Sequence, residues 1–215
     1  MMFGGLRLRI LVLIGWLLMV SSAVDGSYEA TIGGLRTPDG KPIQLDFPIE
    51  RHLKNAAGRD GAGLCVFTSL SQAADWQNVE ALRDFRDWMR QHPGGGWPEK
   101  VDEMITRLCR ERGVSPPEYL HYQGNEITLL QLACKTGRMP CVTYCYSPAG
   151  RYQGRRIAHM VNLLHADERW FAVLDNNFPG SVEWMNASEF RQTFTGLGEG
   201  WAVILLAPAP PPPRP

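Results

Sequence analysis

Apolar and polar residues alternate with two different periods along the chain, and the period changes near residue 140. Between residues 64 and 137, apolar residues recur every three or four positions, which is the spacing of one helix face. Beyond residue 140 they recur at every second position, which is typical of strands with one buried face. The expected helices cover 64–77, 79–91, 98–112 and 126–137, and the expected strands cover 140–146, 157–165, 169–176, 182–185 and 201–206.

One further helix is expected between the last two strands. Asn186 and Glu189 have the spacing of a capping box, which predicts a short helix that continues to Phe194. Helices therefore dominate the first half of the chain and strands the second. This order predicts an α+β fold in which helices and sheet form separate layers.

The segments on either side of this pattern differ from it in composition. Residues 24–54 are rich in Gly, Pro and charged residues, which predicts an extended arm with one short strand at 43–47. Residues 207–215 are almost entirely Pro and Ala and are expected to form a disordered, polyproline-like tail. A single folded domain is therefore expected over residues 55–206.

The first 23 residues have the form of a secretory signal peptide. Arg7 and Arg9 precede an apolar run at 10–20, and the small residues Ser21 to Ala23 follow it. The run is shorter than the roughly 20 residues of a comfortable membrane span. We therefore expect a secreted or periplasmic protein, with an uncleaved membrane anchor through residues 10–20 as the alternative.

Composition and charge exclude several classes of function. Hydrophobic residues make up 44% of the chain and charged residues 20%, with a formal net charge of +0. These values are those of an ordinary globular domain without the basic excess that attracts nucleic acid. The chain has five cysteines, an odd number, so in an exported protein at least one of them is free or pairs between molecules. One reactive thiol with up to two disulfides fits this count, and so does a chain without disulfides. No second ligand pair accompanies Cys141 and Cys145, and neither a metal site nor a cofactor is expected.

Cys65 follows a glycine-bearing loop and begins the first predicted helix. The positive end of the helix dipole and the free N–H groups of the first turn favour the thiolate, which is the nucleophilic form of cysteine. The same N–H groups can donate to an oxyanion in a tetrahedral intermediate. Cys65 is therefore a candidate nucleophile, although a cysteine that merely packs at a helix start has the same local sequence.

A histidine and a carboxylate on consecutive strands strengthen this interpretation. If the strands 157–165 and 169–176 form a hairpin around the loop 166–168, Leu163 is opposite Phe171 and His159 is opposite Asp175. Asp175 would then fix the imidazole tautomer and leave the other ring nitrogen free to accept the thiol proton. A slip of one residue would bring Asn176 into the same role, so Asn176 is the alternative orienting residue.

Other residues near the predicted site are assigned by their position in loops. Phe178, just after Asp175, is the candidate for lining a substrate subsite. The loop from Arg151 to Arg156 is either a solvated loop or a basic region that attracts an anionic group of the substrate. The remaining histidines are expected to be exposed; they are His52, His92, His121 and His165.

The order of these elements resembles that of the papain-like cysteine peptidases. The segments His159-Met-Val-Asn-Leu-Leu and Trp170-Phe-Ala-Val-Leu-Asp175 look most like those of the compact bacterial peptidases that cleave double-glycine leader peptides. The resemblance covers about residues 55–206. It implies an N-terminal helical half that carries the nucleophile helix and packs on a C-terminal antiparallel β-sheet.

The sequence departs from this family at one position. Papain-like enzymes usually carry a Gln shortly before the nucleophile, and its amide helps to form the oxyanion hole. The residue six positions before Cys65 is Arg59, and the nearest upstream amide is Asn55, which becomes the substitute candidate. Loss of one oxyanion donor lowers rates by on the order of 100- to 1000-fold.

Three functions are compatible with these observations. The first is an exported cysteine hydrolase that cleaves peptide or amide bonds through a Cys65–His159–Asp175 triad and a thioester. The second is a catalytically weak or inactive binding or structural protein on the same scaffold, suggested by the missing Gln. The third is a transglutaminase-like acyl transferase, which uses the same chemistry. Peptides or proteins are the expected substrates.

Overall fold

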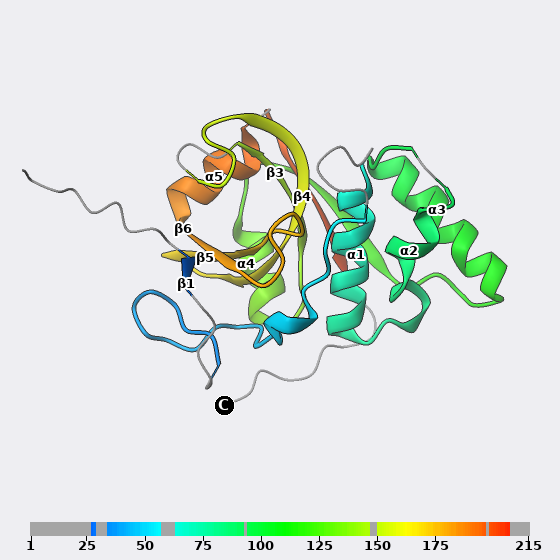
Figure 1. The fold of residues 1–215 in the computed structure, drawn as a ribbon, viewed down its shortest axis with the longest axis horizontal. Helices are drawn as coiled ribbons and strands as arrows, with labels where there is room; N and C mark the ends of the chain where they lie inside the picture. Colours follow the sequence, from blue (N-terminus) through cyan, green and yellow to red (C-terminus); the bar gives the residue numbers. More distant parts are fainter. Residues whose placement is uncertain are drawn as a thin grey trace, which may run out of the picture.

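The fold of the protein is given by a computed structural model, shown as a ribbon in Figure 1. The described residues are 34–56, 63–92, 94–146, 150–196 and 198–206, together with the backbone of the short strand at 27–28. The proposed signal segment, 1–23, and the proline-rich tail, 207–215, lie outside the described residues. No helix in the described part of the chain is long and apolar enough to cross a membrane.

Helices and strands form separate layers, as the order of periods predicts. The helices are η1 (Ile49–Arg51), α1 (Leu64–Gln77), η3 (Glu80–Leu82), α2 (Phe85–Met89), α3 (Pro98–Arg112), α4 (Thr128–Lys135) and α5 (Ala187–Thr195). The strands are β1 (Ser27–Tyr28), β2 (Tyr119–Gly124), β3 (Cys141–Tyr146), β4 (Arg156–Ala166), β5 (Trp170–Leu174), β6 (Val182–Asn186) and β7 (Gly200–Leu205). The predicted α+β class is confirmed.

The strands form one antiparallel sheet in the order β1-β6-β5-β4-β3-β7-β2. The helical half, α1 to α3, lies beside this sheet (Figure 1). Strands β3, β4, β5 and β7 are paired on both edges, and most of their residues are buried. The strand that carries His159 is thus held in the middle of the molecule.

Two apolar clusters cover the two faces of the sheet. On one face, Met160 and Leu164 of β4 pack in the same cluster as Leu70 of α1 and Ile105 of α3. On the other face, residues of α4 and α5 pack against the alternate side chains of the same strands. These residues include Leu130, Phe190, Phe194, Val161 and Leu163. Successive side chains of β4 point to opposite faces of the sheet, so one set packs against α1 and α3 and the other set packs against α4 and α5.

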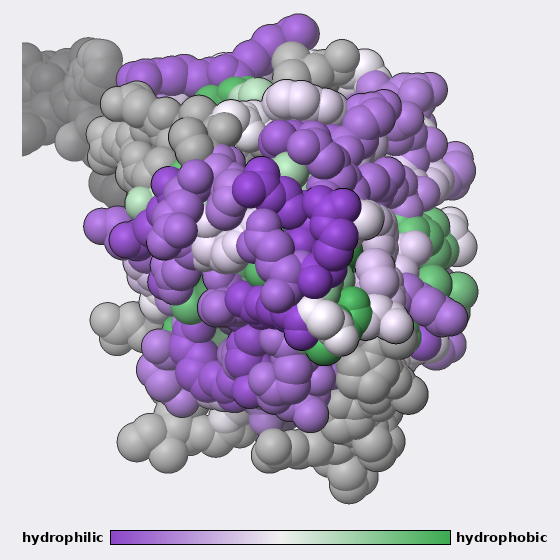
Figure 2. Space-filling model, turned by 90° about the vertical axis from the view of Figure 1, so that its right-hand side faces the viewer, coloured by the Kyte–Doolittle hydropathy of each residue, from purple (hydrophilic) through white to green (hydrophobic). Residues whose placement is uncertain are grey.

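The side formed by the helical half is largely polar toward solvent. Figure 2 shows this side, where hydrophilic side chains predominate and apolar ones are scattered. Helix α3 has an amphipathic sequence, with Val101, Ile105 and Leu108 buried and charged residues such as Arg107 outside. Pro98 occupies its first turn and Gly113 ends it in the left-handed conformation, as the sequence predicts.

The predicted helix over 79–91 is wrong as a continuous element. The chain there forms the 3₁₀ turn η3 followed by the short helix α2. The Ser71 hydroxyl of α1 accepts a hydrogen bond from the Arg86 backbone N–H at 2.7 Å, so a tertiary contact fixes the new helix start. Leu82, Phe85 and Met89 are nevertheless fully buried, as their spacing predicts.

The predicted strand over 43–47 is also wrong. Ile43, Leu45 and Phe47 are buried, but only the Leu45 N–H bonds to the sheet, at the Leu164 carbonyl over 2.9 Å. The side chain of Gln44 then takes the place of a strand partner by bonding both backbone groups of Ala166. The arm therefore crosses the end of β4.

Strand β2 was not predicted, because Tyr119–Gly124 is polar and lies at the sheet edge.

Candidate active site

Cys65 is the second residue of α1, and its side chain is 5% exposed. The N-cap residue of the helix is Gly63, whose φ of 75° is left-handed and whose lack of a side chain leaves the first turn without a side-chain cap. A Cβ at Gly63 would lie 2.2 Å from the Gly96 backbone nitrogen, so the segment around Gly95 and Gly96 packs directly on this helix start. Glycine at position 63 therefore allows the backbone of Gly95 and Gly96 to pack against the start of α1.

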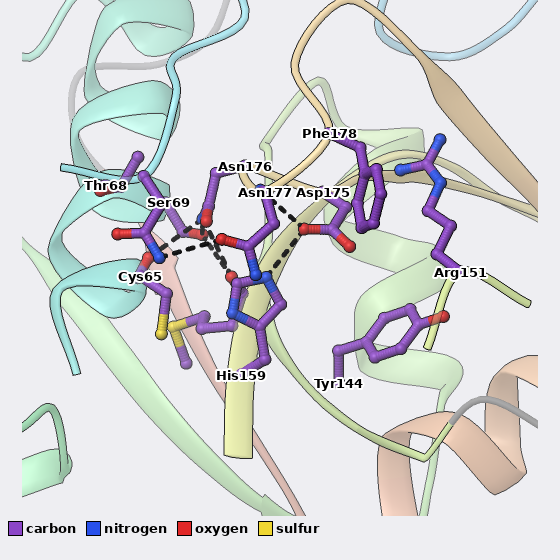
Figure 3. A network of polar contacts seen from close by, with 12 residues as sticks. Cys65, Thr68, Ser69, Tyr144, Arg151, His159, Asp175, Asn176, Asn177 and Phe178 are labelled. Carbon is purple, nitrogen blue, oxygen red and sulfur yellow. Dashed lines mark hydrogen bonds and ion pairs between the residues drawn. The ribbon is translucent and has the colours of Figure 1, made fainter. Parts of the chain in front are cut away.

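His159 lies on β4 with its ring between Cys65 and Asp175 (Figure 3). Its Nε2 atom is 2.8 Å from Asp175 Oδ1. Its other ring nitrogen, Nδ1, is on the side of the ring that faces the sulfur of Cys65. His159 is 7% exposed and Asp175 is completely buried. The structure therefore brings together the three side chains that the sequence analysis selected.

The predicted register of the β4–β5 hairpin is wrong by two residues. Leu163 pairs with Val173 instead of Phe171, and a bulge lies between Leu163 and His165. The turn forms later than expected because Asp167 Oδ1 accepts hydrogen bonds from the backbone N–H groups of Arg169 and Trp170. A shift of two preserves the face on which each side chain lies, so His159 and Asp175 still meet, diagonally.

Asp175 lies just beyond β5 and accepts hydrogen bonds on both carboxylate oxygens. Oδ1 accepts from the Asn177 backbone N–H at 2.9 Å as well as bonding His159, and Oδ2 accepts from the Tyr152 hydroxyl at 2.8 Å. Burial alone raises the pKa of this carboxyl. The hydrogen bonds and the charge of His159 outweigh burial and lower the pKa below its usual value. Asp175 is therefore a carboxylate at neutral pH.

The electrostatics of His159 follow from the same contacts. Burial lowers the pKa of the imidazole, but hydrogen bonds to Asp175 and Cys65 and the charges of these groups raise it to about 9. The imidazolium form is thus favoured at neutral pH. The buried carboxylate of Asp175 stabilises this positive charge.

Asn176, the alternative orienting residue, has a different set of partners. Its Nδ2 atom lies 3.2 Å from the Cys65 carbonyl, 3.1 Å from Ser69 Oγ and 3.0 Å from the Met160 carbonyl. It therefore joins α1 to β4 at Met160, the residue after His159. Its amide is directed away from the imidazole, and Asp175 occupies the orienting position (Figure 3).

The oxyanion candidate Asn55 is buried near the same loop. Its backbone N–H donates to the Asn176 carbonyl at 2.7 Å, and its Nδ2 donates to Asn177 Oδ1 at 3.1 Å. The Asn55 side chain thus helps to hold the segment beside Asp175. Arg59, which stands where papain-like enzymes carry Gln, lies outside the described residues.

Phe178 and the basic loop before β4 pack against each other. The Arg151 guanidinium carbon lies 4.9 Å from the centre of the Phe178 ring, and Arg151 Nη2 donates to Ser181 Oγ at 2.7 Å. The interpretation of Arg151 as part of a solvated loop is wrong, because this side chain is mostly buried. Arg155 and Arg156 remain exposed.

The expectation that the remaining histidines are exposed is also wrong. His52 is 8% exposed, and its Nδ1 accepts from the Gly180 backbone N–H. His165 is 4% exposed beside Trp184 and lies 3.2 Å from Asp167. His121 and His92 are partly buried, the first bonded to Asp102 and Trp201 and the second stacked on Trp88.

Sequence reasoning missed several residues of this network, and Tyr152 is one of them. It lies in the loop before β4, where no periodicity marks it, and only the folded chain brings its hydroxyl to Asp175. All five cysteines are buried and none forms a disulfide. Within the described segments, no group of three His, Cys, Asp or Glu side chains is placed to hold a metal ion.

Comparison of the fold with solved structures identifies its architecture. A crystal structure titled "putative C39-like peptidase" from Bacillus anthracis aligns with a TM-score of 0.51, covering 74% of this chain and 96% of the other. The protein has a papain-like fold. The sequences are only 12% identical, so the likeness to this papain-like neighbour concerns the fold alone. No protein-family model and no curated protein matches the sequence.

Proposed function

We propose that the protein is a cysteine hydrolase that cleaves peptide or amide bonds through a thioester at Cys65. The observation that carries this proposal is the position of the His159 ring between Cys65 and Asp175, with its Nε2 atom 2.8 Å from Asp175 Oδ1. This is the arrangement that nucleophile, base and orienting group require. The papain-like fold, with Cys65 at the start of α1, supports the same chemistry.

The reaction follows from the residues present. The Cys65 thiolate attacks the carbonyl carbon of the scissile bond, and the oxygen becomes an oxyanion near the first turn of α1. The Cys65 backbone N–H can donate to it, and Asn55 is the candidate second donor. His159 then gives its Nδ1 proton to the leaving amine, which breaks the C–N bond and leaves a thioester. Water, deprotonated by His159, hydrolyses the thioester and restores the thiol.

Asp175 keeps the imidazole in the required tautomer throughout this cycle. Its Oδ1 accepts the Nε2–H of His159, so the exchangeable proton is the one on Nδ1, toward Cys65. The buried carboxylate also stabilises the imidazolium that precedes proton transfer to the leaving group. The substrates proposed are peptides or proteins outside the cytoplasm, because residues 1–23 have the form of a signal peptide.

The proposal is tested by measuring hydrolysis of a peptide library by mass spectrometry. Wild-type protein is compared with Cys65→Ala and with Cys109→Ala, a matched control that removes a buried thiol from α3. Cleavage by the wild type and Cys109→Ala, and its loss in Cys65→Ala, would support the hydrolase. Absence of any Cys65-dependent turnover would contradict it and favour a binding protein. Incorporation of a labelled amine in place of hydrolysis would assign acyl transfer.

A further inference from the structure

The hydroxyl of Tyr152 bonds two residues of the site at once. It lies 2.8 Å from Asp175 Oδ2 and 2.9 Å from Asn177 Nδ2. An amide NH₂ can only donate, so the hydroxyl oxygen accepts from Asn177. Its single proton is then left for the Asp175 carboxylate, and the direction of this hydrogen bond is fixed.

This contact completes the set of donors around Asp175. Oδ1 is shared by the Asn177 backbone N–H and the His159 ring, while Tyr152 holds Oδ2. A carboxylate bonded at one oxygen can still rotate about its last side-chain torsion. Donors on both oxygens fix the plane of the group, and therefore the direction from which it meets the imidazole.

The position of Tyr152 is itself well determined. Its ring makes edge contacts with Tyr144, His159 and Phe178, at centroid distances of 5.5, 6.0 and 5.6 Å. Burial, followed by the charge of Asp175, raises the pKa of the phenol, so it remains a proton donor across the neutral range.

We propose that Tyr152 is a positioning residue, which holds Asp175 so that His159 can take the proton of Cys65. The inference rests on the proposed role of His159 as the base. The phenol keeps its own proton and touches neither the sulfur nor the substrate carbonyl in this scheme. Tyr152 acts on Cys65 only through the Asp175 carboxylate. The effect is greatest at pH values at which the Cys65 thiolate forms only by proton transfer to His159.

The test is alkylation of Cys65 by iodoacetamide, which requires no knowledge of the substrate. The full chain is labelled at about pH 6.5 and about pH 9.5, and modification of the Cys65 peptide is followed by mass spectrometry. Near pH 6.5 an ordinary thiol is protonated, so reaction reports the thiolate formed with His159. At the higher pH, hydroxide removes the thiol proton without help from the histidine.

Tyr152→Phe is compared with Tyr144→Phe, which deletes a neighbouring hydroxyl that bonds Glu183. We expect Tyr152→Phe to slow alkylation about tenfold at the lower pH, since hydrogen bonds to charged groups have effects of this size. At the higher pH its rate should match that of the wild type. Tyr144→Phe should match the wild type at both values.

Four results would overturn the inference. Equal slowing of Tyr152→Phe at both pH values would assign the hydroxyl to packing or access. Unchanged labelling would show that it has no role, and an altered far-UV circular dichroism spectrum would assign it to stability. A wild-type Cys65 that reacts no faster than free cysteine near pH 6.5 would instead remove the proposed function, and this inference with it.

Discussion

His159 Nε2 lies 2.8 Å from Asp175 Oδ1, although the two residues do not face each other across the hairpin. Leu163 pairs with Val173, so continuation of the register would place Val161 opposite Asp175. The imidazole and the carboxylate therefore meet along a diagonal of the sheet. This geometry makes the contact depend on how Asp175 is held as well as on strand pairing.

Substitution of Asp175 by Asn should abolish most of the proposed activity. The amide cannot stabilise the imidazolium and can present a donor to His159, which favours the wrong tautomer. We expect hydrolysis to fall by on the order of 100-fold or more. Asp167→Asn is the matched control, because Asp167 pairs with His165 on the same hairpin. Comparable losses in both variants would mean that the effect arises from the stability of the hairpin.

The proposed catalytic pair and its environment were predictable to different degrees. Local signals were sufficient for α1, which begins and ends at the predicted residues, and for the capping box of Asn186 and Glu189. The contact of His159 with Asp175 was predictable because an error of two residues in register leaves the face unchanged. Tyr152 was not predictable, since its hydroxyl reaches Asp175 only through the fold of an irregular loop.

Stability should fall between about pH 6.5 and 9 because of His159. Its pKa is raised from 6.5 to about 9 in the folded state, so the folded protein binds more protons than the unfolded chain in that window. The contribution is complete below pH 6.5 and is lost as pH rises toward 9. Urea midpoints for the wild type should therefore decline across this range, and those of His159→Gln should decline less. Equal declines of the urea midpoint in the wild type and in His159→Gln would show that His159 does not cause this pH dependence.

His52 should have the opposite effect at lower pH. Burial lowers its pKa from 6.5 to about 4, although the charge of Asp175 acts in the opposite direction. As pH falls, the unfolded chain therefore binds a proton at His52 before the folded protein does. Stability should fall as pH drops from about 6.5 toward 4. His52→Gln should reduce this acid-side loss in urea titrations while leaving the alkaline side unchanged. A variant with the same acid-side slope as the wild type would argue against this role.

Substitution of Asn176 should destabilise the junction between α1 and β4. Asn176→Ala removes the donor that faces three acceptors, including the carbonyls of Cys65 and Met160. Buried groups that lose their partner cost about 1–3 kcal/mol each. Asn176→Asp should be worse than Ala, because it replaces the donor by a further acceptor. Equilibrium unfolding in urea ranks the variants, and the reverse order would contradict the bonding pattern.

Gly63 combines two constraints that a matched variant can separate. Its φ of 75° is unfavourable for other residues, and a Cβ would lie within 2.2–2.7 Å of the backbone of Gly95 and Gly96. Gly113, at the end of α3, has a similar φ of 66° but has open space around it. Gly113→Ala should therefore lower the free energy of unfolding by only about 1 kcal/mol.

Gly63→Ala should lower it by clearly more, because the backbone at Gly95 and Gly96 must move away from the start of α1. The same movement displaces the first turn that carries Cys65, so alkylation of Cys65 should change in Gly63→Ala and stay constant in Gly113→Ala. Equal losses of stability in the two variants would show that backbone conformation alone requires glycine at position 63. The packing of Gly95 and Gly96 on the start of α1 would then contribute nothing to the difference in stability.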